Sequence, residues 1–479
     1  MNRWAGWRRP RSLDVSLMYA SRLLRSLGMA GRTRGEGRFA AEGLGAWLEI
    51  VPSGPLTGDL AAPPSKSVTN RLLVVASLAA GRSRLEGVLD SDDTAAMVTG
   101  LRSFGVRIEE SRSAEPAAPA ARQILSIEGT DGQLAAPAAV VDARLSGTTL
   151  RFLAALSLLA GGTTTLDGCP PLRKRPTAAL IEALASLGAG VVSDGGFPPI
   201  SVSSSGLQGG YLEVDAAASS QFVTALLLVA PYASSDSEIE VVNLGASGYV
   251  DLTVDVMRRF GARVVQIGAR YQVSAAHRYV ARDVVVEYDA SSAAHLFALA
   301  MATGGSVRVT NARRHTLQPD ARILDLFCEM GGQVTRAGDQ LLLAGPQLPL
   351  PIEADLAAMP DQLATVAVLA ALAEGRSALR GLAVARGHET DRVAAVSAEL
   401  RRLGAGVCSG EDWLEVVGGG LHGGLVETYD DHRMAMAFTA LAARVPGIRL
   451  RSPGCVAKTY PGFFEDAAML GLELRPAGA

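Results

Sequence analysis

The sequence predicts an α/β protein built from six similar units that are grouped into two domains. Its 479 residues exceed what one hydrophobic core usually serves. One short pattern recurs: an amphipathic helix ends in a bulky apolar residue, a glycine follows, and a β-type run comes next. The six glycines lie 67–83 residues apart, at Gly105, Gly188, Gly261, Gly331, Gly404 and Gly471. Near-equal spacing of this kind indicates an internally repeated architecture.

Each unit also contains a second helix nearer its start, with small polar residues at its N-terminus and an almost wholly apolar interior. These helices are predicted over 67–80, 148–160, 220–230, 291–303, 361–374 and 431–443. A helix that is apolar on all sides is expected to be buried. The six glycines are expected to end the other helices in the left-handed conformation. Three units on each side of about residue 286 predict two domains with a cleft between them.

The composition is that of a globular protein without a nucleic-acid or membrane partner. A net charge of -3 and an aromatic content of 5% provide neither a basic field nor stacking rings for nucleic acid. The longest apolar runs, 72–80 and 222–231, fall short of the roughly 18 residues that a membrane span needs. Four cysteines without a CxxC pair argue for a reducing compartment and against structural zinc. We therefore expect a cytoplasmic protein.

Residues 1–45 differ from the rest of the chain. They carry nine arginines against three acidic residues and have no clear apolar stretch of the signal-peptide type. A transit-like leader, a basic tail or a wrongly assigned start codon would each give this pattern, with Met18 and Met29 as alternative starts. We predict a poorly ordered or misassigned N-terminal extension. A nucleic-acid role for these arginines is a weaker alternative.

The most unusual polar residues lie at the N-termini of the predicted buried helices. Helix N-termini carry unpaired N–H groups and a partial positive charge, which makes them anion sites. A lone serine or aspartate there is usually a helix cap, but a cap does not require a charged or amide neighbour. The candidate ligand residues at these helix starts are Lys66, Ser67 and Arg71 at the first helix, Gly147 at the second, Ser219, Ser220 and Gln221 at the third, Asp361 at the fifth and Arg433 at the sixth. Because buried charges need partners, this set predicts a substrate with more than one anionic group.

Lysine is rare in this chain, which makes each lysine informative. Only three of the 45 basic residues are lysines: Lys66, Lys174 and Lys458. Lys174 and Arg175 belong to "RKRP", which a solvated turn would also explain, and Lys458 belongs to "AKTYP". Arginine clamps planar anions, whereas lysine is a compact charge whose proton can be moved. The retained lysines therefore indicate a chemical need for an ammonium group.

Ten motifs, in this order along the chain, resemble those of the EPSP synthase family, the 3-phosphoshikimate 1-carboxyvinyltransferases. They are "PPSKSVTNR", "DSDDT", "SGTTLR", "LRKRP", "SSQF", "YDASSA", "MPDQ", "HETDR", "YDDHRMAM" and "AKTYP", and they span roughly 46–475. The resemblance implies the two-domain enolpyruvyl transferase fold, an inside-out α/β barrel in which each domain has three βαβαββ repeats. It also implies that 46–64 belong with 287–479, and that 65–286 form the other domain.

The resemblance further implies a reaction and its residues. The enolpyruvyl group of phosphoenolpyruvate would pass to the 5-hydroxyl of shikimate 3-phosphate with release of phosphate, on the shikimate pathway to chorismate and aromatic amino acids, in a monomer without metal or organic cofactor. Matching positions for shikimate 3-phosphate are Lys66, Ser67, Arg71, Ser219, Ser220, Gln221, Asp361 and His388. Those for phosphoenolpyruvate are Lys66, Gly147, Arg175, Gln221, Arg392, Arg433 and Lys458. Asp361 would be the base for the hydroxyl, and Glu389 or Lys66 would protonate the enol methylene.

The chain also departs from the family pattern near the expected shikimate-3-phosphate contacts. His388 stands where many members have lysine, so a fixed cation becomes a group that titrates near neutral pH. Val384 replaces an asparagine that some members use, Leu145 follows Arg144 before the "SGT" turn, and the usual serine of the next motif is shifted to Ser247. These changes leave affinity for shikimate 3-phosphate and glyphosate sensitivity open.

Two other functions would also explain part of this pattern. The sister enzyme that uses UDP-N-acetylglucosamine has a nucleophilic cysteine in a loop before its Arg-Pro, and Cys169 lies six residues before Arg175. That enzyme, however, has Lys-Asn where this chain has Lys66-Ser67. A non-catalytic homologue that binds phosphorylated metabolites is the second alternative. The presence of Asp361, Glu389 and Lys458 argues against it.

Overall fold

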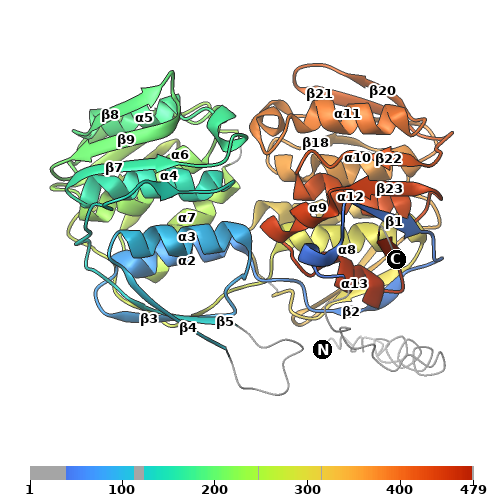
Figure 1. The fold of residues 1–479 in the computed structure, drawn as a ribbon, viewed down its shortest axis with the longest axis horizontal. Helices are drawn as coiled ribbons and strands as arrows, with labels where there is room; N and C mark the ends of the chain where they lie inside the picture. Colours follow the sequence, from blue (N-terminus) through green and yellow to red (C-terminus); the bar gives the residue numbers. More distant parts are fainter. Residues whose placement is uncertain (1–38, 113–122, 246, 314, 477–479) are drawn as a thin grey trace, which may run out of the picture.

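The computed structural model describes residues 39–112, 123–245, 247–313 and 315–476. These residues form two domains that lie side by side (Figure 1). Six four-stranded sheets are found in the described ranges, three in each domain. One hydrophobic core fills each domain. The predicted repeated α/β architecture is therefore confirmed.

The first domain contains three sheets and three pairs of helices. Its strands are β3 (Arg82–Glu86), β4 (Arg107–Arg112), β5 (Gln123–Glu128), β6 (Val141–Asp142), β7 (Gly162–Asp167), β8 (Gly190–Asp194), β9 (Phe197–Ser204), β10 (Gly210–Asp215), β11 (Ser237–Val242), β12 (Val264–Ile267), β13 (Arg270–Val273) and β14 (Val284–Val285). Its α-helices are α2 (Lys66–Leu78), α3 (Asp92–Ser103), α4 (Gly147–Leu156), α5 (Ala178–Ser186), α6 (Gln221–Val229) and α7 (Gly248–Arg259).

The second domain has the same composition. Its strands are β1 (Trp47–Val51), β2 (Thr57–Leu60), β15 (Ser306–Val309), β16 (Gln333–Ala337), β17 (Gln340–Ala344), β18 (Glu353–Asp355), β19 (Arg376–Arg380), β20 (Gly406–Ser409), β21 (Trp413–Val417), β22 (Gly424–Val426), β23 (Ile448–Arg451) and β24 (Glu473–Pro476). Its α-helices are α8 (Ala290–Thr303), α9 (Ile323–Glu329), α10 (Leu363–Leu372), α11 (Arg392–Arg402), α12 (His432–Ala442) and α13 (Phe463–Met469).

All six sheets share one topology. In the unit β6-α4-β7-α5-β8-β9, β6 and β7 pair in parallel, β7 and β9 pair antiparallel, and β8 lies at the edge beside β9. The parallel pair requires a crossover, which a buried helix supplies. The orders β10-β11-β13-β12 and β18-β19-β21-β20 repeat this arrangement. The βαβαββ repeat is thus the building block.

Three sheets are completed by strands from elsewhere in the chain. In the first domain, β14 pairs in parallel with β3. In the second domain, β2 pairs in parallel with β15, and β1 lies between β23 and β24. From residue 39 onward, the chain therefore runs first through the second domain, enters the first before α2 and returns after β14. On this pairing we propose 65–286 as one domain and 46–64 with 287–479 as the other.

The residues just before β1 are also packed. A 3-10 turn covers Ala41–Gly43, and Leu44 is fully buried in the core of the second domain. The second domain therefore includes residues that precede 46. The remainder of the predicted N-terminal extension, residues 1–38, lies outside the described residues.

The buried helices lie inside each domain and the sheets lie outside, as the labels in Figure 1 show for α2, α4 and α6. Every residue of α10 is buried, which matches its wholly apolar sequence. The six repeat glycines all have positive φ, between 90° and 105°, as predicted. The predicted buried helices are found within a few residues. The predicted start at Asp361 lies in the 3-10 turn Pro360–Gln362, and α10 begins at Leu363.

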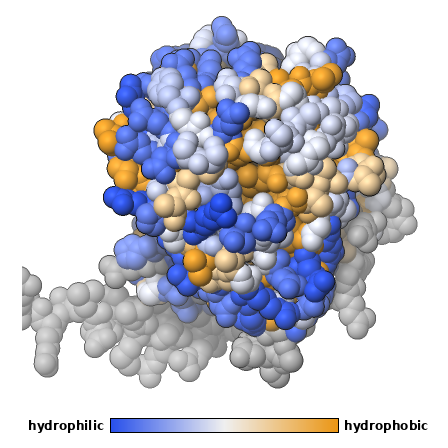
Figure 2. Space-filling view, turned by 90° about the vertical axis from the view of Figure 1, so that its left-hand side faces the viewer, coloured by the Kyte–Doolittle hydropathy of each residue, from blue (hydrophilic) through white to orange (hydrophobic). Residues whose placement is uncertain are grey.

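The outer face of the first domain is mainly hydrophilic, with separate apolar areas between the charged ones (Figure 2). Exposed apolar side chains of this domain include Val192, Tyr211 and Ile267. In the described ranges, no helix combines the length and the apolar character that crossing a membrane would require.

Candidate active site

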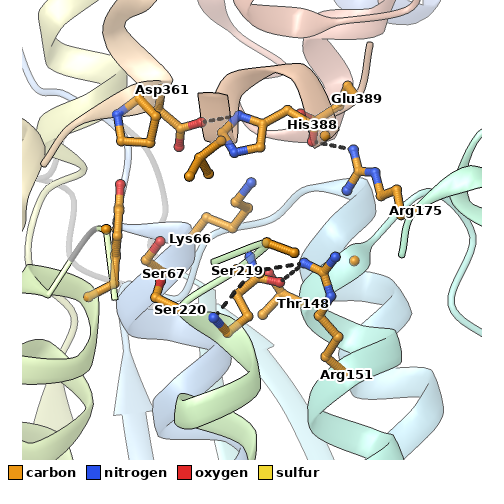
Figure 3. Close-up of a pocket in the computed structure, with 18 of the residues that line it drawn as sticks. Lys66, Ser67, Thr148, Arg151, Arg175, Ser219, Ser220, Asp361, His388 and Glu389 are labelled. Carbon is orange, nitrogen blue, oxygen red and sulfur yellow. Dashed lines mark hydrogen bonds and ion pairs between the residues drawn. The ribbon is translucent and has the colours of Figure 1, made fainter. Parts of the chain in front are cut away.

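A polar cavity lies where helix N-termini of the two domains face each other. The first domain contributes the starts of α2, α4 and α6, and the second contributes the turn before α10 and the starts of α11 and α12. Figure 3 shows Lys66, Ser67, Ser219, Ser220 and Arg151 on one side, with Asp361, His388 and Glu389 on the other. All predicted site residues except Lys458 line this cavity: Lys66, Ser67, Arg71, Gly147, Arg175, Ser219, Ser220, Gln221, Asp361, His388, Glu389, Arg392 and Arg433.

The helix caps are supplied by the residues just before the predicted site residues. Ser65 accepts the N–H of Val68 at the start of α2, and Ser146 accepts the N–H of Thr149 at the start of α4. The Ser67 hydroxyl is therefore not required for capping and faces the cavity. A helix start whose cap is already provided can offer its next polar side chain to a ligand.

Arg71 is fixed by hydrogen bonds on one wall of the cavity. Its guanidinium donates to the Ser67 carbonyl at 2.9 Å, to Thr253 Oγ1 at 2.8 Å and to the Tyr249 carbonyl at 3.0 Å. Burial lowers the pKa of Arg71 to about 10, which still leaves it charged at neutral pH. The chain thus holds a buried cation with neutral acceptors alone, which suits an anionic ligand group.

Arg151, the last residue of "SGTTLR", is not among the predicted site residues but lines the cavity. It donates to Gln221 Oε1 at 2.7 Å and to Ser219 Oγ at 3.2 Å, and so orients two predicted ligands (Figure 3). Burial and the neighbouring Arg175 lower the pKa of Arg151 to about 9. Its position one turn after Gly147 was the available signal. Other lining residues that sequence reasoning missed are Asp93, Thr148, Tyr249 and His432.

Gly147 allows Arg175 to lie over the start of α4. A Cβ atom at position 147 would stand 2.8 Å from Arg175 Nη1, closer than carbon and nitrogen atoms pack. Arg175 reaches across the cavity to Glu389, with Nη2 at 3.1 Å from Oε1. The glycine therefore serves the approach of an arginine, in addition to any approach of a ligand.

Asp361 is a carboxylate held between two arginines. Arg392 Nη1 lies at 2.7 Å from its Oδ1, and Arg433 Nη2 lies at 2.8 Å from its Oδ2. Burial alone would raise the pKa of Asp361, but Arg433 and Arg392 outweigh it and hold the pKa well below its usual range. Asp361 is therefore ionised and able to accept a proton.

Glu389 is shared among three cations. Lys458 Nζ lies at 2.6 Å and Arg175 Nη2 at 3.1 Å from Oε1, and Arg392 Nη2 lies at 2.5 Å from Oε2. Burial opposes ionisation, yet Lys458, Arg175 and Arg392 together hold the pKa of Glu389 well below normal. Lys458 lies behind Glu389 and also donates to the Leu145 carbonyl at 3.2 Å.

Arg392 is the centre of this charge network. Its side chain is fully buried and also bonds Asp431, with Nε at 2.7 Å from Oδ2. Although burial disfavours the cation, Asp431, Glu389 and Asp361 raise the pKa of Arg392. Asp431 is at the same time the cap of α12, since it accepts the N–H of Arg433 at 2.9 Å.

His388 is held in the neutral form by its neighbours. Arg392 Nη1 donates to His388 Nδ1 at 2.8 Å, and because a guanidinium only donates, the ring proton is on Nε2. The 3.4 Å approach of Nδ1 to Asp361 Oδ1 is then a contact and no hydrogen bond. Burial and Arg392 lower the pKa of His388 to about 4. Of the other departures, Val384 also lines the cavity, whereas Ser247 precedes α7 and is not among the lining residues.

The arrangement can bind two anionic ligands at once and provides an ionised carboxylate beside them. Lys66 completes it, with Nζ at 3.2 Å from Asp93 Oδ2. Within the described ranges, no group of three or more His, Cys, Asp or Glu residues is placed to hold a metal ion. Cys169 is free, is partly exposed and is not among the lining residues.

Comparison with known proteins agrees with this geometry. Residues 50–467 match the family described as EPSP synthase (3-phosphoshikimate 1-carboxyvinyltransferase). Curated relatives of that name include one from Methanoculleus marisnigri, 38% identical over 423 residues (87% of this chain and 98% of the relative), and one from Nostoc punctiforme, 39% identical over 414 residues (86% and 95%).

Two solved structures share the fold. EPSP synthase from Acinetobacter baumannii has a TM-score of 0.74 at 24% identity and covers 90% of this chain and 99% of its own. The enolpyruvyl transferase NikO from Streptomyces tendae has a TM-score of 0.70 at 18% identity, with 90% and 98% covered. Together with the family match over residues 50–467 and relatives at 38–39% identity, these likenesses show that the chain belongs to the EPSP synthase family.

Proposed function

We propose that the cavity transfers the enolpyruvyl group of phosphoenolpyruvate to the 5-hydroxyl of shikimate 3-phosphate and releases phosphate. The family and the names of the relatives support this transferase reaction of the shikimate pathway. The observation that carries the residue assignment is the ionised Asp361, held at 2.7 and 2.8 Å from two arginines within a cavity rich in cations.

The two substrates fit different parts of the cavity. Arg71, Ser67 and the Ser219–Gln221 segment belong to the first domain, and we assign them to shikimate 3-phosphate. Arg175 of the first domain and the cations of the second domain form ion pairs with Glu389 and Asp361. We assign these cations, which include Arg392, Arg433 and Lys458, to the carboxylate and phosphate of phosphoenolpyruvate. Arginine suits planar anions through paired hydrogen bonds.

Asp361 takes the proton of the 5-hydroxyl as its oxygen attacks C2 of phosphoenolpyruvate. Its two arginines are also proposed ligands of phosphoenolpyruvate, so the incoming anions draw positive charge away from Asp361. The pKa of Asp361 then rises toward that of an effective base. Substrate binding and base strength are coupled through the same two side chains.

Glu389 supplies the proton that C3 receives in the same step. The three cations that contact Glu389 are also proposed ligands of phosphoenolpyruvate. When they pair with the anions of the ligand, they stabilise the Glu389 carboxylate less, so the pKa of Glu389 rises and it can carry a proton. In the second step Glu389 takes a proton back from C3 of the tetrahedral intermediate, the C2–C3 double bond re-forms, and the C2–O bond to phosphate breaks. Lys66, at the start of α2, stabilises charge on the leaving phosphate.

Phosphate release from phosphoenolpyruvate, with and without shikimate 3-phosphate, tests the reaction. We expect release only when both are present, and none with UDP-N-acetylglucosamine. Asp361→Ala should lower kcat, and Lys66→Met should lower kcat/KM for phosphoenolpyruvate, each by about 10²-fold or more. Asp325→Ala, at an exposed position, is the matched control for Asp361→Ala. Near-normal turnover of Asp361→Ala would remove its role as base.

We also propose a monomer in the cytoplasm. Free cysteines at all four positions support a reducing compartment, and the cavity is complete within one chain.

A further inference from the structure

Asp320 is a buried carboxylate that the proposed reaction does not use. It lies in the 3-10 turn Pro319–Arg322 of the second domain and is fully buried. It accepts hydrogen bonds from Tyr249 Oη at 3.1 Å, from Gln362 Nε2 at 2.7 Å and from the Ser291 hydroxyl. Three donors around one buried carboxylate compensate for its removal from water.

One of these donors comes from the other domain. Tyr249 is at the start of α7 in the first domain and lines the cavity. The preceding residue, Gly248, packs against the Asp320 turn so closely that a Cβ atom there would stand 2.9 Å from Pro319 Cβ. The bond from Tyr249 to Asp320 therefore lies within a close contact between the domains.

The other end of the network reaches the proposed base. Gln362 follows Asp361 in the turn Pro360–Gln362, and its side chain is fully buried. The hydrogen bond from its side-chain amide to Asp320 fixes this turn, which also contains Asp361. On the first-domain side, the Tyr249 carbonyl accepts from Arg71 at 3.0 Å. A continuous chain thus runs from an anion-binding arginine in one domain to the base in the other.

We propose that Asp320 is a positioning residue that aligns Asp361 when Tyr249 of the first domain docks against the second domain. Without the hydrogen bond from Tyr249, Asp320 is held less firmly. Its hydrogen bond to Gln362 then fixes the turn that contains Asp361 less well. The rate of proton transfer to Asp361 therefore depends on the hydrogen bond between Tyr249 and Asp320, although this bond contacts neither the 5-hydroxyl oxygen nor C2 of phosphoenolpyruvate. This inference rests on the assignment of Asp361 as the base.

A double-mutant cycle on Tyr249→Phe and Asp320→Asn tests the proposal. Each single variant should lower kcat by about tenfold or more, the range expected for a hydrogen bond to a charged group. KM for shikimate 3-phosphate should change less than kcat. The double variant should lose no more than Asp320→Asn alone, because both changes break one chain.

Tyr279→Phe is the matched control. Tyr279 donates a buried hydrogen bond to the Leu228 carbonyl within the first domain. That variant should lower Tm at least as much as Tyr249→Phe does and leave kcat unchanged, which separates positioning from general stability. If Asp320→Asn does not fold, the comparison of the two tyrosine variants decides.

Two results would overturn the inference: kcat of Tyr249→Phe within twofold of the wild type, or losses that multiply in the double variant. Asp361→Ala is measured alongside. Retained turnover in that variant would refute the base assignment, whereas retained turnover in Tyr249→Phe alone would refute only the coupling.

Discussion

Arg392 shows how a fully buried cation can be kept at the centre of an anion-binding site. Its guanidinium contacts Asp361, Glu389 and Asp431 in the substrate-free site. Carboxylates thus neutralise the cation until ligand anions arrive, since an unpaired buried charge would be costly. The i, i+3 spacing in "HETDR" made the Glu389 partner predictable. Asp431 lies 39 residues away, and no local pattern indicates that pair.

His388 should not behave as a titrating cation in the active range. Its folded pKa of about 4 lies below the usual value of 6.5, so the ring is neutral throughout neutral pH and becomes charged only as pH falls toward 4. Its free Nε2–H can donate into the cavity (Figure 3). We expect kcat/KM for shikimate 3-phosphate to have the same pH profile in the wild type and in His388→Gln between about pH 5.5 and 8.

The size of the effect separates two roles for His388. His388→Gln keeps a neutral donor and should stay within a few-fold of the wild type, whereas His388→Leu should lose roughly two- to tenfold, as for one neutral hydrogen bond. A fall of wild-type kcat/KM above pH 6.5 that His388→Gln abolishes would show that the cation acts, against this expectation.

At the scale of elements, the sequence predicted most of what local chemistry determines. The helix-ending glycines and the apolar buried helices follow from near-neighbour preferences and were found where expected. The start of α10 was placed too early, because Pro360 favours a tight first turn that the apolar pattern does not reveal. The pairing of β14 with β3 joins residues about 200 positions apart and could not be predicted from local pattern.

Gly404 should tolerate alanine less well than Gly471 does. Both end helices of the second domain, with φ of 100° and 105°. A Cβ atom at Gly404 would stand 2.5 Å from the Gly420 carbonyl oxygen, whereas at Gly471 the nearest atom is a Leu56 methyl at 3.9 Å. We expect Gly471→Ala to cost about 1–2 kcal/mol for the left-handed backbone alone, and Gly404→Ala to cost clearly more.

Denaturant unfolding of the two glycine variants gives this comparison. Because both glycines end helices of the same domain and lie away from the cavity, phosphate release should be unaffected in the folded protein. Equal midpoints for the two variants would show that the chain near Gly420 moves aside without cost.

At the scale of the whole molecule, the site is assembled by contacts between domains. Arg175 pairs with Glu389 across the cavity, and Lys458 reaches the Leu145 carbonyl of the opposite domain. The sequence named three of these four groups as site residues, and Leu145 only as a departure from the family pattern. It could not show that the proposed ligands of phosphoenolpyruvate are first occupied by Glu389 and Asp361, since that follows from how the two domains face each other.

Glu389→Gln should separate the two consequences of this arrangement. The neutral amide no longer competes with phosphoenolpyruvate for Arg175 and Lys458, so KM for phosphoenolpyruvate should fall, by about threefold or more. It also cannot deliver a proton, so kcat should fall by about 10²-fold. Glu415→Gln, which breaks an exposed pair with Arg376, is the control and should change neither constant. Steady-state kinetics at saturating shikimate 3-phosphate measure both: a rise in KM would contradict the competition between Glu389 and substrate, and an undiminished kcat would assign the proton to Lys66.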